Sequence, residues 1–201
     1  MAIRKASLAV VIVALTVTVA LSAQAPPAPV MWGWPQDVLR LDGLRLGISS
    51  QSTTAPSERA GFVISLQNVG TNDFVLNLGM MLANGRVMFP DAIRVVLTNP
   101  DGRSRELKFF DRRYPGIAGR VDDFIVALRG GATYVLPVTL DQYWSAETGE
   151  YGVKLKPGRH RISARFEGRG AAHVNGDTPG VKLLNFWHGT VNSGVLEFYA
   201  R

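Results

Sequence analysis

The chain has 201 residues, of which 22 are Lys or Arg, 16 are Asp or Glu and none is Cys. The lack of cysteine excludes a disulfide scaffold, a thiolate metal or iron–sulfur site and a cysteine nucleophile. Apolar residues make up 46% of the chain and charged residues 19%, which is typical of a folded domain with a substantial core and not of a disordered protein.

The N-terminus has the layout of a secretory signal peptide. Two basic residues precede an apolar run of 14 residues, 8–21, which is too short to span a bilayer comfortably, and small residues follow it. We predict a Sec signal peptide over 1–23, cleaved after Ala23 or alternatively after Ala25, with an uncleaved membrane anchor as the other interpretation. The protein is then secreted or periplasmic and has no transmembrane span after cleavage.

Residues 24–38 are rich in proline and tryptophan, which predicts an extended leader with polyproline character. From there on the hydrophobic pattern changes to a period of two, so we predict one folded domain over 39–201. The inward-facing side chains of its strands are expected to be Phe62, Ile64 and Leu66; Phe74, Leu76 and Leu78; Ile93, Val95 and Leu97; Tyr134, Leu136, Val138 and Leu140; Ile162, Ala164 and Phe166; and Leu196 and Phe198.

Turn signals separate these segments. Asn99–Gly102 reads Asn-Pro-Asp-Gly between two β-rich runs and predicts a hairpin, and Pro157-Gly158 predicts a second turn. Pro137 marks its strand as an edge or bulged strand. No stretch shows a sustained helical period. We therefore predict an all-β fold, an antiparallel two-sheet immunoglobulin-like β-sandwich of about eight or nine strands, interrupted by long loops at 111–123 and 167–187.

The order of these pieces resembles that of a known group of domains. A strand ending in Gln-Asn-Val-Gly at 67–70, the Asn-Pro-Asp-Gly hairpin, Leu-Asp-Gln-Tyr-Trp at 140–144 and Leu-Lys-Pro-Gly-Arg-His-Arg at 155–161 follow one another within residues 60–166. This arrangement resembles bacterial immunoglobulin-like accessory domains, including the domain of the BsuPI intracellular proteinase inhibitors. The resemblance covers about half of the chain and rests on turn and core positions, so it implies a fold and, as an alternative function, proteinase inhibition.

The sequence contains no recognisable catalytic or metal-binding motif. His160, His173 and His188 lack metal-ligand spacing and are expected to be surface or partly buried histidines, and no nucleophile motif occurs. The adjacent carboxylates of Asp122 and Asp123 could supply oxygen ligands to calcium, but we expect both residues to be solvated loop acids. We predict no enzyme activity, no metal and no cofactor.

A basic strand is the most suggestive functional feature. Arg159, Arg161 and Arg165 occupy odd positions of one predicted strand and therefore project from its solvent-facing side. Such a stripe suits an anionic polymer, while the alternative is a solvated face without a ligand. Because no aromatic residues interleave with it, we expect no specific nucleic-acid binding.

Aromatic residues near Trp144 and Trp187 allow two interpretations, stacking on sugar rings or covering the ends of the core, and we favour the second. Trp187 is expected to plug one end of the sandwich, and it also belongs to our candidate binding residues. The remaining candidates, Arg112, Arg113 and Tyr114, lie in the first long loop.

The functional expectation is an exported, non-catalytic binding or accessory domain that recognises an envelope protein or an extracellular polymer. The alternative is a proteinase inhibitor whose exposed loop, 111–123, enters a protease cleft. The sequence does not indicate an oligomeric state.

Overall fold

Three antiparallel sheets form the framework of the described residues. The computed structural model describes residues 43–51, 60–110, 119–149 and 151–200. All of these belong to one unit of the chain, Trp34–Arg201. The predicted signal peptide and leader, and the candidate residues Arg112, Arg113 and Tyr114, lie outside the described residues.

The regular structure of the described residues is twelve strands and two short 3-10 helices. The strands are β1 (Leu44–Ser50), β2 (Gly61–Asn68), β3 (Phe74–Leu82), β4 (Val87–Phe89), β5 (Ile93–Thr98), β6 (Ser104–Phe109), β7 (Asp122–Leu128), β8 (Thr133–Thr139), β9 (Tyr143–Ser145), β10 (Gly158–Gly168), β11 (Gly189–Asn192) and β12 (Leu196–Ala200). The 3-10 helices are η2 (Leu140–Gln142) and η3 (Pro179–Leu183).

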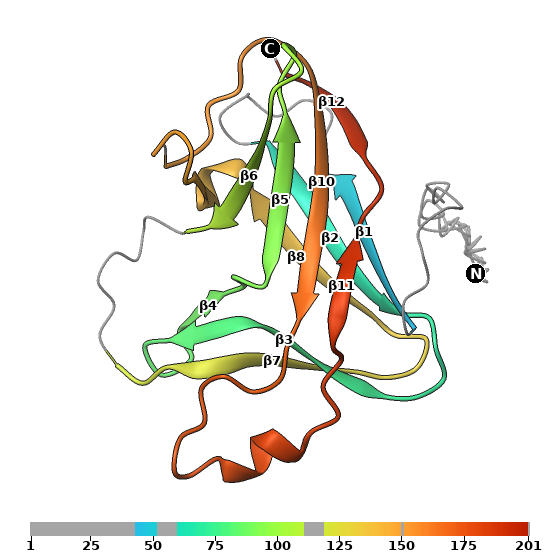
Figure 1. The fold of residues 1–201 in the computed structure, drawn as a ribbon, viewed down its shortest axis with the longest axis vertical. Coiled ribbons are helices and arrows are strands. Elements are labelled where there is room, and N and C mark those ends of the chain that lie inside the picture. The colour runs from blue at the N-terminus through green and yellow to red at the C-terminus, as the bar shows by residue number, and fades with distance from the viewer. Residues whose placement is uncertain (1–42, 52–59, 111–118, 150, 201) are drawn as a thin grey trace, which may run out of the picture. The chain divides into compact units, whose positions relative to one another are not determined.

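The strands pair in three groups, shown in Figure 1. One sheet has the order β1-β2-β8, the second has β11-β10-β5-β6-β9 and the third has β4-β3-β7. In the second sheet, β12 and β11 lie one after the other along the same side of β10, while β5 pairs with its other side. All of these strand pairs are antiparallel, so the predicted all-β antiparallel class is confirmed.

The described strands outnumber the eight or nine that the sequence predicted. The additional ones are short: β4 and β9 have three residues each and β11 has four. A period of two cannot be recognised over so few residues. The long-loop boundaries also move, because Asp122 and Asp123 begin β7 and Glu167 and Gly168 end β10.

The core lies where the alternation predicted it. Phe62, Ile64 and Leu66 of β2 are buried, as are the inward residues of β5 and β10, while their sequence neighbours are partly or fully exposed. Strand β8 pairs only with β2 and places Pro137 opposite Val63, so the predicted edge position of Pro137 is confirmed. Proline has no backbone N–H to donate to a neighbouring strand, so an edge strand tolerates it better than an inner one.

Trp187 closes one end of this core. Its side chain is 5% exposed and its ring packs on that of Phe166, with centroids 5.7 Å apart. The backbone of β3 holds the tryptophan in place, because Trp187 N–H donates to the Val75 carbonyl at 2.8 Å. The indole therefore covers the core, as the sequence suggested, and contributes little to the surface.

This packing generates a stability prediction. A Cβ added at Gly168 lies 2.6 Å from the carbonyl oxygen of Trp187, within the overlap range of two heavy atoms. Gly168→Ala is therefore expected to displace the tryptophan and to lower the free energy of unfolding by about 2–3 kcal/mol, measured by chemical denaturation. Gly176→Ala is the matched control, because nothing lies within 4 Å of its Cβ. Equal effects of the two variants contradict the packing role of Gly168.

Candidate functional site

The predicted basic strand is β10, and its arginines do share the outer face. Arg159 and Arg161 are exposed and Arg165 is half-buried, while the alternating residues Ile162 and Ala164 are buried in the core. Register across the sheet extends this face to the neighbouring strands. Residues of β5, β6 and β12 whose side chains lie on it include Arg94, Lys108, Glu106 and Glu197.

Carboxylates neutralise part of this face. Arg165 pairs with Glu167 at 2.9 Å, and Arg159 donates to Glu197. Arg94 contacts Glu106 at 3.0 Å and the same Glu167 at 3.7 Å. The face therefore carries alternating charges along its ion-paired part rather than an uninterrupted positive stripe.

Two cations of the outer face make no ion pair with another described residue, namely Arg161 and Lys108. Lys108 instead lies over the ring of Trp144, 6.0 Å from its centroid. On its other flank, Trp144 stacks against Tyr151 with centroids 6.1 Å apart. The register places Trp144 beside Lys108 on the outer face of the sheet, so Trp144 does not cover an end of the core, which corrects that expectation for this residue.

The hairpin between β5 and β6 lies between two hollows. Its turn closes through Gly102 N–H to the Asn99 carbonyl, 2.9 Å, and Gly102 adopts a positive φ of 82°, which glycine tolerates. On the outer side, a hollow of about 240 Å³ is lined by Arg159, Arg161 and Glu197 together with the turn. The predicted Arg159 and Arg161 therefore border a concave feature and not only a flat sheet.

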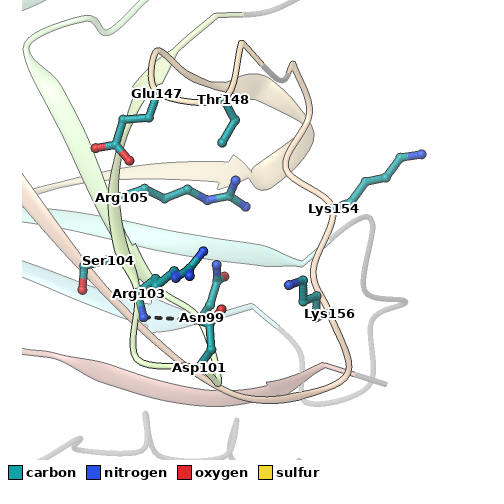
Figure 2. Close-up of a pocket in the computed structure, with 9 residues that line it drawn as sticks. All are labelled: Asn99, Asp101, Arg103, Ser104, Arg105, Glu147, Thr148, Lys154 and Lys156. Carbon is teal, nitrogen blue, oxygen red and sulfur yellow. Dashed lines mark hydrogen bonds between the residues drawn. The ribbon is translucent and has the colours of Figure 1, made fainter.

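The second hollow, of about 460 Å³, lies on the other side of the hairpin (Figure 2). Its cations are Arg103 and Arg105 from the hairpin and Lys154 and Lys156 from the segment that precedes β10. The sequence interpretation missed all four, because Arg105 sits at an inward position of its strand and the lysines precede a turn. The alternation Val-Lys-Leu-Lys at 153–156 was the available signal.

Asp123 joins the ends of the two long loops. Its carboxylate is almost completely buried, and Oδ2 accepts from the backbone N–H groups of Ala172 and His173 at 3.0 and 3.1 Å. Oδ1 accepts from Asn77 Nδ2 at 3.1 Å and contacts His173 Nδ1 at 3.2 Å. Asp123 is thus a structural clamp between β7 and the segment after β10, which corrects the expectation of a solvated loop acid.

The neighbouring Asp122 is also engaged by nitrogen donors. It accepts from Arg120 Nε at 2.7 Å and from Asn175 Nδ2 at 2.6 Å. Arg120 also donates to Asp177, and this hydrogen bond lowers the pKa of the Asp177 carboxyl. Nitrogen donors thus contact both oxygens of Asp123 and Oδ1 of Asp122. In the described ranges, no three His, Asp or Glu side chains gather at metal-binding distance.

His160 corrects a further expectation, because it is completely buried rather than on the surface or partly buried. Its Nε2 lies 2.7 Å from the carbonyl oxygen of Lys156, and since a carbonyl only accepts, Nε2 carries the proton. The ring stacks on Phe198 with centroids 5.4 Å apart. His160 thus attaches the Lys156 backbone to β10.

Comparisons with known proteins leave the family of this chain open. No protein-family model and no curated protein matches the sequence. Among solved structures, the chain is similar to the beta-D-glucoside glucohydrolase from Trichoderma reesei, at 12% identity and a TM-score of 0.30 over 78% of this chain and 18% of that one. It is also similar to the Bacteroides uniformis beta-glucuronidase, at 14% identity and a TM-score of 0.28 over 76% of this chain and 13% of that one. The chain thus spans less than a fifth of either protein.

Within the described residues, no helix is both long and apolar enough to cross a membrane.

The Asp123 clamp generates the second prediction. Asp123→Asn replaces one acceptor oxygen by an NH₂ group that faces other N–H donors, so we expect the free energy of unfolding to fall by about 2–4 kcal/mol. Asp101→Asn is the matched control, since Asp101 is exposed and asparagine also suits a turn. Chemical denaturation of both variants measures the difference. If the Asp123→Asn variant is as stable as the control, the structural role of Asp123 is contradicted.

Proposed function

We propose that this protein is an exported, non-catalytic binding module that recognises an anionic extracellular polymer through the outer face of β10 and its neighbours. The observation that carries the proposal is the charge of that face. Five cations share it with three carboxylates, and Arg161 and Lys108 are the two cations outside the ion pairs of the described residues. The cations are Arg94, Lys108, Arg159, Arg161 and Arg165, and the carboxylates are those of Glu106, Glu167 and Glu197.

The spacing of these charges suits a repeating ligand. Side chains two residues apart on a strand are about 7 Å apart, and neighbouring strands are about 5 Å apart, so the cations form a lattice rather than a point. A polyanion that lies across such a lattice releases condensed counterions, which gives salt-dependent affinity without a deep pocket. The hollow beside Arg159 and Arg161 adds a concave end to this surface.

We also propose that the fold is an immunoglobulin-like two-sheet sandwich, with the β1-β2-β8 sheet on one side and the sheet around β10 on the other. Support comes from the antiparallel order of both sheets and from the buried residues that β2 and β10 direct into one core cluster. The third sheet, β4-β3-β7, is an addition to this arrangement. Proteinase inhibition through 111–123 stays a prediction, because most of that loop lies outside the described residues.

The proposal predicts which charges govern polymer affinity. Arg161→Glu combined with Lys108→Glu removes the two cations that lie outside ion pairs, so we expect the affinity of the protein for heparin, used as a model polyanion, to fall at least roughly tenfold at about 0.1 M salt. The slope of log affinity against log salt is expected to become shallower by about two. Titrations at several salt concentrations measure both quantities.

The charge-matched control is Arg129→Glu combined with Lys182→Glu. Both residues are exposed and lie outside the sheet around β10. This control is expected to retain most of the affinity, and an equal loss in both double variants means that net charge alone drives binding. The proposal of a polymer ligand is overturned if the wild-type protein binds no polyanion. Capture of a single envelope protein independently of salt would then favour a protein partner.

A further inference from the structure

Each of the two outer-face cations that lie outside the ion pairs of the described residues has an aromatic ring as a neighbour. Lys108 lies over the ring of Trp144, 6.0 Å from its centroid. Arg161 lies diagonally across the β10–β12 pair from Tyr199, which the register places opposite Arg159. Diagonal neighbours of this kind are about 7–8 Å apart. The Tyr199 side chain is 76% exposed, so its ring is open to a ligand.

The two cations and the two rings follow one diagonal line across the sheet. Strands β12, β10, β5 and β6 lie side by side in this order (Figure 1). The line begins on β12 and crosses one strand and two residues at each step, through Tyr199, Arg161, Val96 and Lys108, and Trp144 lies opposite Lys108 on β9. Each step is about 8 Å, so Arg161 and Lys108 are about 17 Å apart. A linear ligand of several monomers therefore reaches both cations and both rings.

The groups around this line suit hydroxyls as well as acids. Three glutamates lie among the cations, and they accept hydrogen bonds from hydroxyl groups but repel a chain that carries only anionic oxygens. Thr98 lies opposite Arg161, and its Oγ1 is 2.8 Å from Oγ of Ser104, so two hydroxyls also border the line. This mixture favours a hydroxyl-rich anion over a polyphosphate.

From this arrangement we infer that the polymer is an acidic polysaccharide whose sugar rings carry carboxylates, a hexuronic acid chain. Arg161 offers a planar donor fork that matches a carboxylate, and the flexible Lys108 turns from the ring of Trp144 to a second carboxylate. Tyr199 and Trp144 pack on the apolar faces of the sugar rings, and the hollow of about 240 Å³ beside Arg161 receives sugar substituents. This inference rests on the proposed polymer surface and names the class of its ligand.

Equilibrium titrations of the whole protein with polygalacturonate, and with inorganic polyphosphate of the same charge number, test this ligand class at about 0.1 M salt. We expect polygalacturonate to bind at least roughly tenfold more tightly. Tyr199→Ala and Trp144→Ala are each expected to weaken polygalacturonate binding at least roughly fivefold, because a sugar ring loses its apolar contact. Both variants are expected to leave polyphosphate binding within roughly twofold of the wild-type value.

The salt dependence separates the rings from the charges. Neither aromatic variant removes a cation, so the slope of log affinity against log salt is expected to stay at the wild-type value, unlike that of Arg161→Glu combined with Lys108→Glu. Tyr199→Phe keeps the ring and is expected to retain the affinity. Leu183→Ala is the matched control, because Leu183 is an exposed apolar residue outside the sheet around β10. Should Trp144→Ala fail to fold by circular dichroism, Tyr199→Ala decides the question, since its ring is exposed.

Polyphosphate that binds as tightly as polygalacturonate, or polygalacturonate affinity that survives Tyr199→Ala, overturns the polysaccharide. If heparin affinity still falls in Arg161→Glu combined with Lys108→Glu, the proposed polymer surface stands without a contribution from sugar rings. If the wild-type protein binds none of these polymers, both proposals fail. A single-stranded oligonucleotide that binds more tightly than polygalacturonate, and loses affinity in Tyr199→Ala, overturns the polysaccharide in favour of base stacking.

Discussion

The two-sided character of β10 is the constraint on which most of this structure depends. Its even-numbered residues, from His160 to Phe166, are buried, and its odd-numbered residues form the charged outer face. Three strands pair with it, β5 on one side and β12 and β11 in succession on the other, so a shift of register by one residue would bury the arginines. The hydrophobic core and the charged face are therefore fixed by the same pairing.

The same strand also positions segments on both sides of the sheet. At its beginning, His160 holds the backbone of Lys156, while Arg159 and Arg161 border the hollow on the outer side. At its far end, the chain passes into the segment that Asp123 clamps to β7. Hydrogen bonds from the buried side chains of His160 and Asp123 to backbone groups thus hold these two segments in place.

The charged residues of the outer face form local ion pairs rather than one uniformly positive surface. On the outer face, glutamates pair with Arg159, Arg165 and Arg94, which limits the electrostatic attraction of a polyanion and leaves Arg161 and Lys108 to contribute most. A flat lattice with partial compensation suits a repeating polymer.

The sequence by itself determined several of the longer strands, the hairpin at Asn99–Gly102, the edge position of Pro137 and the side of β10 on which its arginines lie, because a period of two and turn chemistry are local properties. Only the tertiary structure decided how charges far apart in sequence pair. Glu197 reaches Arg159 through the pairing of β12 with β10, and Asp123 meets His173 across fifty residues. The second hollow, lined by Arg105, Lys154 and Lys156, likewise brings together residues about fifty positions apart, so no argument from spacing along the chain could find it.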